Sequence, residues 1–108
     1  MRLQVKGRNL EVSASIREYA ERKLRRLDKQ LNESTGVELE LCVEKNPSIA
    51  NGHVAEATIF TKGSTLRGRE RAADMKAAID LLADNLERQV ERYRSKRRRK
   101  PAHKTVKE

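Results

Sequence analysis

Residues 72–100, AADMKAAIDLLADNLERQVERYRSKRRRK, decide the fold because they predict one long amphipathic helix. Apolar side chains recur in this stretch at intervals of three or four residues, at Met75, Ile79, Leu82, Leu86, Val90 and Tyr93. In an α-helix this spacing places all of them on one stripe, which another element has to cover. We therefore expect the rest of the chain to pack against this helix.

The charged side chains of the same stretch are sorted by sign around the predicted helix. At about 100° of rotation per residue, the acids between residues 80 and 91 fall on one flank of the apolar stripe. The bases Arg88, Arg92 and Lys96 fall on the other flank. A solvated charged helix is the simpler interpretation, but the separation of signs onto opposite flanks favours a docking surface.

The length and net charge of the sequence indicate one small basic domain with a polyanionic partner. The chain has 108 residues and a net charge of +9, and nucleic acid is the commonest partner of so basic a protein. A membrane surface is a weaker possibility, since the basic helix lacks the Trp and Phe that anchor such helices. No stretch reaches the length of a membrane span, and the single Cys42 fits a reducing compartment. We therefore expect a soluble, cytoplasmic protein that does not bind membranes.

Residues 2–31 predict a short strand followed by a helix. The alternation of residues 2–6, RLQVK, turns Leu3 and Val5 inward, as in a strand. Ser13 or Ser15 can cap the helix that follows, whose apolar face runs on to Leu31. The second helix, by contrast, has no obvious N-cap.

The first helix sorts its charges in the same way as the second. Arg22, Arg26 and Lys29 share one flank, and Lys23 lies at the margin of the apolar face. The acids of this helix fall on the opposite flank. Two helices with the same arrangement strengthen the interpretation of a docking surface.

Three further strands are predicted, over residues 37–45, 53–61 and 65–69. The first of them alternates most clearly, with glutamates on its outward face. We interpret that outer face as too acidic to bind RNA. In the next strand the inward residues Ala55 and Ala57 are small, which suits a helix that crosses the sheet closely. Turn-forming residues around Pro47 and Gly63 separate the three strands.

The order β-α-β-β-β-α predicts an α+β fold with a four-stranded mixed sheet. Strands two to four can form an antiparallel meander, and the first strand can pair in parallel with the second through the helical crossover. Two roughly parallel helices then cover the one apolar face. We expect this domain over residues 1–98, followed by a basic disordered tail or the start of a linker over residues 99–108.

Several strings resemble the ribosome hibernation-promoting factors, also called ribosome-associated translation inhibitors or subunit-interface proteins. The matching strings are SIREYAERKLRRLDK, VAEATIF and ADMKAAIDLLADNLERQVERYRSK, and the resemblance covers nearly the whole chain. It implies a domain similar in fold to double-stranded RNA-binding domains. It also implies a partner, the small ribosomal subunit with its rRNA, bound in the channel of messenger and transfer RNA. The function implied is translation regulation by ribosome hibernation, which preserves idle ribosomes in the stress response and in stationary phase.

The resemblance also implies which residues contact rRNA. These are Lys23, Arg26 and Lys29 in the first helix and Arg88, Arg92 and Lys96 in the second, to which we add Arg22 and Arg97. Many relatives have Tyr where this chain has Lys76, so aromatic packing is expected to be lost there. Longer relatives carry a second, β-rich domain that pairs two ribosomes, and self-association is expected only through such a C-terminal domain.

Enzymatic activity is not expected. Neither histidine lies in a motif with a carboxylate or cysteine, and Cys42 has no partner for a metal site, so we expect no catalytic residues, no metal and no cofactor. Aromatic residues make up only 3% of the chain, which favours recognition of RNA by shape and phosphates over base stacking. Two alternatives stay open: a general structured-RNA-binding module or RNA chaperone without ribosome preference, and a protein-interaction module whose basic tail binds an acidic partner.

Overall fold

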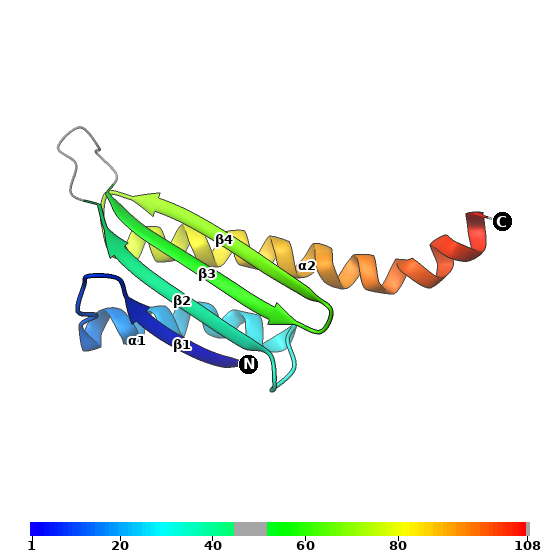
Figure 1. Ribbon diagram of the computed structural model, residues 1–108, viewed down its shortest axis with the longest axis horizontal. Coiled ribbons are helices and arrows are strands. Elements are labelled where there is room, and N and C mark those ends of the chain that lie inside the picture. Colours follow the sequence, from blue (N-terminus) through cyan, green and yellow to red (C-terminus); the bar gives the residue numbers. More distant parts are fainter. Residues whose placement is uncertain (45–51, 108) are drawn as a thin grey trace.

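The structure of the chain, a computed structural model, describes residues 1–44 and 52–107, with side chains described as far as Lys96. Its elements are β1 (Arg2–Gly7), α1 (Ala14–Leu24), the 3₁₀ helix η1 (Arg25–Lys29), β2 (Gly36–Val43), β3 (His53–Thr61), β4 (Ser64–Ala72) and α2 (Met75–Lys107). The predicted α+β class and element order are confirmed (Figure 1). The loop predicted after the second strand falls largely on residues 45–51, which lie outside the described residues.

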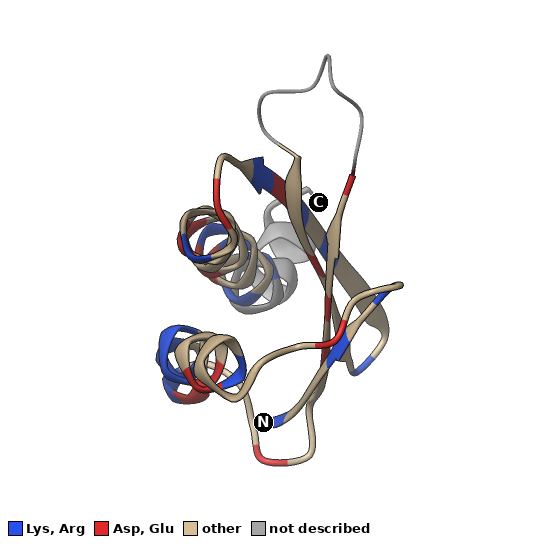
Figure 2. Ribbon diagram, turned by 90° about the vertical axis from the view of Figure 1, so that its left-hand side faces the viewer, with Lys and Arg blue, Asp and Glu red and all other residues tan. Residues whose placement is uncertain are grey.

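The four strands form one mixed sheet in the order β1-β2-β3-β4. As predicted, β1 pairs in parallel with β2, and the other pairs are antiparallel. The register places Val5, Leu39, Ala57 and Gly68 in one row across the sheet. Both helices run in the same direction and cover the same face of the sheet (Figures 1 and 2).

The hydrophobic core lies between this face and the two helices. Leu39 and Ile59 of the sheet are fully buried, as are Leu24 of α1 and Leu82 and Leu86 of α2. The other residues that the alternation turned inward are buried or packed against this core. Burial of this apolar surface is the main favourable contribution to folding, and it holds both helices against one sheet.

The first helical segment differs from the prediction in its second half. An α-helical face was expected as far as Leu31, but α1 ends at Leu24 and the chain continues as η1. Leu27 of η1 remains buried, so the tighter geometry preserves the core contact. Ser13 is the N-cap, since its Oγ accepts a hydrogen bond from the N–H of Ile16 at 3.2 Å.

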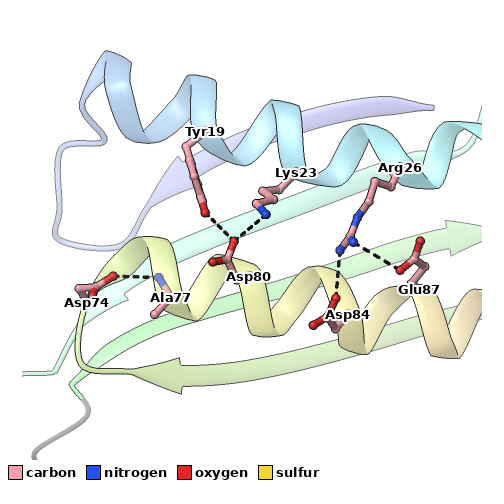
Figure 3. Close-up of polar contacts among 8 residues, drawn as sticks. All are labelled: Tyr19, Lys23, Arg26, Asp74, Ala77, Asp80, Asp84 and Glu87. Atoms are coloured by element: carbon pink, nitrogen blue, oxygen red, sulfur yellow. Dashed lines mark hydrogen bonds and ion pairs between the residues drawn. The ribbon is translucent and has the colours of Figure 1, made fainter.

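The second helix begins at Met75, after a β4 strand that continues through Ala72. Asp74 caps it, because Asp74 Oδ1 accepts the N–H of Ala77 at 2.8 Å (Figure 3). The expectation that this helix lacks an N-cap is therefore wrong. α2 also continues through most of the residues expected to form a tail. The domain boundary at residue 98 stays a prediction.

Candidate nucleic-acid interface

Two rows of basic residues lie on the helices, which cover the same face of the sheet (Figure 2), and all of them except the half-buried Lys23 are exposed. The first row, on α1 and η1, includes Arg22, Lys23, Arg26 and Lys29; the second row, on α2, consists of Arg88, Arg92 and Lys96. The residues predicted to contact rRNA are therefore not on opposite sides of the molecule. The side chain of Arg97 lies outside the described residues.

Acidic residues of α2 face the first row across the gap between the helices (Figure 3). Lys23 Nζ lies 3.3 Å from Asp80 Oδ1, and the Tyr19 hydroxyl donates a hydrogen bond to the same oxygen at 2.6 Å. This hydrogen bond and burial raise the pKa of Tyr19 above its ordinary value. Asp80 thus joins α1 to α2 through two different donors.

Arg26 makes the second connection between the helices. Its guanidinium lies 3.1 Å from Asp84 Oδ1 and 3.7 Å from Glu87 Oε1. These contacts and those of Asp80 form what we call the seam, which consists of Tyr19, Lys23, Arg26, Asp80, Asp84 and Glu87. The structure thus pairs these acids of α2 with bases of the other helical segment.

The ion pairs of the seam contribute little to stability. The Arg26 side chain is 43% exposed and that of Asp84 is 56% exposed, so water and salt screen the attraction between them. Exposed pairs of this kind are worth about 0–1 kcal/mol each. The seam therefore matters more for the charge pattern of the surface than for holding the helices together.

Five other predicted residues make no ion pair with the described residues. Within the part of the chain that the structure describes, no carboxylate lies within ion-pair distance of Arg22, Lys29, Arg88, Arg92 or Lys96. All five side chains are exposed. The structure thus divides the predicted set into these unpaired cations and two cations, Lys23 and Arg26, that are paired in the seam.

Four further exposed bases lie on the described parts of these segments, Arg17, Arg25, Lys76 and Arg94, and none of them was selected from the sequence. The change to 3₁₀ geometry at Arg25 alters the direction of later side chains, which a wheel drawn at about 100° per residue cannot represent. Lys76 lies 5.3 Å from the centre of the Tyr19 ring, where Arg22 and Lys23 also approach. A cation over the tyrosine face replaces the aromatic packing that was expected to be lost.

The outer face of the sheet carries both signs of charge, and the interpretation that this face is too acidic to bind RNA stays a prediction. Arg8, just after β1, donates a hydrogen bond to Glu40 at 2.7 Å, which raises the pKa of Arg8. On the other side, Arg69 and Arg71 of β4 approach Glu44 to 3.1 and 2.9 Å. Strand pairing brings these arginines from distant parts of the chain beside the glutamates of the outer face.

No group of three His, Cys, Asp or Glu side chains in the described part of the chain is placed to hold a metal ion. Likewise, none of the described helical segments is both long enough and apolar enough to cross a membrane.

Comparison with known proteins gives consistent similarities. The family described as sigma 54 modulation protein / S30EA ribosomal protein matches residues 3–98. A ribosome hibernation promotion factor of Picosynechococcus sp. is 35% identical over 104 residues, which are 95% of this chain and 54% of that protein. A ribosome hibernation promoting factor of Azotobacter vinelandii is 34% identical over 96 residues, 89% of this chain and 85% of that protein.

Similarity extends to a solved structure. The Thermus thermophilus Protein Y N-terminal domain superposes with a TM-score of 0.73 at 35% identity, covering 86% of this chain and 99% of that domain. The chain spans about half the length of several of the curated relatives it matches. The similarity therefore concerns about half of those longer proteins.

Proposed function

This chain belongs to the sigma 54 modulation protein / S30EA ribosomal protein family, and from that premise we propose that it is a non-enzymatic, ribosome-binding hibernation factor. It binds the small ribosomal subunit in the cytoplasm and occupies the channel of messenger and transfer RNA. In that position it inhibits translation and preserves idle ribosomes. The names of its relatives, ribosome hibernation promotion factors, support the ribosome as its partner.

The observation that carries the proposal is the placement of the five unpaired cations. Arg22 and Lys29 lie on α1 and η1, and Arg88, Arg92 and Lys96 lie on α2. Each is exposed and free to neutralise a phosphate of folded rRNA, which releases condensed counterions and so favours binding. Both rows lie on helical segments that pack on one common core, which sets the spacing of the rows.

The aromatic residues support recognition of shape and phosphate over base stacking. The hydroxyl of Tyr19 is bonded to Asp80, and that of Tyr93 donates to the carbonyl oxygen of Lys62 at 3.2 Å. Phe60 is 47% exposed, but it lies on the outer face of the sheet. Its neighbour in β3, Ile59, is buried on the opposite face, which the helices cover. The helical surface therefore resembles a phosphate-binding surface for structured RNA more than a platform for single-stranded bases.

A sucrose-gradient experiment with a charge-reversal variant tests this function. We expect the wild-type chain to comigrate with small subunits or whole ribosomes and to compete with transfer RNA. Arg88→Glu combined with Arg92→Glu should abolish comigration, because two phosphate contacts become repulsive. The matched control is Lys6→Glu with Arg67→Glu, which makes the same change of charge at exposed positions on the outer face of the sheet.

The outcomes separate the alternatives. Comigration of the Arg88/Arg92 variant would show that the proposed face is wrong, and loss of comigration in the control variant would show that net charge alone matters. Competition by an unrelated RNA duplex as effective as that by ribosomes would favour a general structured-RNA-binding module. Circular dichroism on both variants checks that they are folded.

A further inference from the structure

We propose that the acidic residues of the seam determine the selectivity of RNA binding, an inference that rests on the function proposed above. Asp80, Asp84 and Glu87 lie between the first and second rows of cations. They divide what would otherwise be one broad cationic surface into two separate rows. An RNA that binds well has to place its phosphates over both rows and keep them away from the seam.

The acidic flank of α2 extends beyond the carboxylates that pair with the first helix. Asp84 is 56% exposed although it lies 3.1 Å from Arg26. One turn beyond Glu87, Glu91 continues the same flank, and among the described residues no cation lies within ion-pair distance of it. Because the acids extend beyond their partners, pairing with the first helix does not explain the whole row.

The acids also act on the cations they contact. Lys23 and Arg26 are held by carboxylates, so a phosphate that approaches either of them has to displace a partner of its own charge. A phosphate that approaches Arg22 or Lys29 on the same segment has no carboxylate to displace. A generic polyanion that slides over the helices therefore meets attraction at the rows and repulsion between them.

The class of RNA that fits this pattern follows from the chemistry of the carboxylate. A carboxylate accepts hydrogen bonds, so the groups suited to the seam are donors such as ribose 2′-hydroxyls and exocyclic amines of bases. Folded RNA presents such donors between two phosphate rows. We infer that the seam selects an RNA surface with donors in the middle and phosphates on both sides.

The test removes seam charge without changing side-chain shape. Asp84→Asn with Glu87→Gln is compared with Glu11→Gln plus Glu33→Gln, which makes the same change in net charge at exposed positions off the two long helices. Dissociation constants are measured at one fixed salt concentration for salt-washed ribosomes and for an unrelated RNA duplex. We expect the seam variant to bind the duplex more tightly, on the order of tenfold, with a smaller change for ribosomes.

The expected result is thus a fall in the ratio of ribosome affinity to duplex affinity that the control variant does not show. Equal ratios in the two variants, or tighter binding to ribosomes and duplex alike, would overturn the inference. Weaker duplex binding by the seam variant would also overturn it, since the acids would then serve to position Lys23 and Arg26 for phosphate. If the wild-type chain bound ribosomes no better than the duplex, the proposed function would be refuted. The difference in duplex affinity between the seam variant and the control variant would still test whether the seam carboxylates repel RNA phosphates.

Discussion

Tyr19 connects the two helices through more than one kind of contact. Its hydroxyl donates to Asp80 at 2.6 Å, and its half-buried ring has the cationic ends of Arg22, Lys23 and Lys76 within 5.3 to 5.7 Å of its centre. The hydrogen bond to Asp80 is the main cause of the raised pKa of the phenol, with burial second, and Arg22 opposes the shift. One side chain therefore reports on the packing of α1 against α2.

The raised pKa of Tyr19 gives a pH dependence with a definite sign. The folded state binds the phenolic proton more tightly than the unfolded state, whose pKa is about 10, so this contribution to stability is complete below that pH. It is lost as the pH rises through the higher pKa of the folded protein. Thermal unfolding in alkaline buffers should show this loss for the wild type and much less of it for Tyr19→Phe.

An ultraviolet titration of the phenols provides the direct measurement. The chain has two tyrosines, so Tyr93→Phe leaves Tyr19 as the only phenol to observe. Its midpoint should lie above the ordinary value of about 10. A midpoint at or below that value would show that the hydrogen bond to Asp80 does not persist in solution.

At the scale of elements, α2 is held in place along β4 by close packing and by polar contacts. A Cβ atom added at Gly68 would lie 3.0 Å from Leu86 Cδ2, so the helix lies tightly against this strand. Beside this contact, Asn85 Nδ2 donates to Glu70 at 2.7 Å and Gln89 Nε2 donates to the carbonyl oxygen of Arg67 at 2.6 Å. These contacts fix which flank of α2 faces the strand and thereby where the second row of cations lies.

The substitution Gly68→Val tests this close approach. Two methyl groups and a Cβ would be forced against Leu82 and Leu86, and overpacking of this kind costs about 1–3 kcal/mol in the free energy of unfolding. Urea denaturation should show a lower midpoint. Thr65→Val, an exposed position on the same strand, is the control and should leave the midpoint nearly unchanged. An unchanged midpoint for Gly68→Val would mean that α2 lies farther from the sheet than described.

At the scale of the whole molecule, the domain is flat and elongated, with extents of 56 × 30 × 18 Å. The sheet forms one layer and the helices the other, and α2 continues past the end of the sheet (Figure 1). The two faces differ in how many of their charged side chains form ion pairs. Most outer-face glutamates contact arginines, whereas the two rows of the helical face include the unpaired cations Arg22, Lys29, Arg88, Arg92 and Lys96.

The salt dependence of ribosome binding tests which face contacts RNA. Each phosphate contact contributes close to one unit to the slope of log K against log salt concentration, so Arg92→Gln should reduce the magnitude of that slope by about 1. Arg67→Gln removes a charge that is also exposed, on the outer face, and should leave the slope unchanged. Equal slopes for both variants and the wild type, from binding titrations at several salt concentrations, would contradict the proposed orientation.

The sequence by itself determined the fold class, the order of the elements, the strand pairing and the apolar face of each element. Local periodicity carries this information, because the repeat of apolar residues depends only on the geometry of the element in which they lie. It also placed Arg88 and Arg92 on the flank opposite the acids of α2.

Only the tertiary structure decided what each charged flank faces. Tyr19 and Asp80 are 61 positions apart in the chain, and no local pattern indicates that the acids of α2 meet Lys23 and Arg26. The same holds for Glu44, whose arginine partners come from β4. A periodic pattern specifies the side of an element on which a residue lies, but the neighbour on that side is set by how the elements pack over their common core.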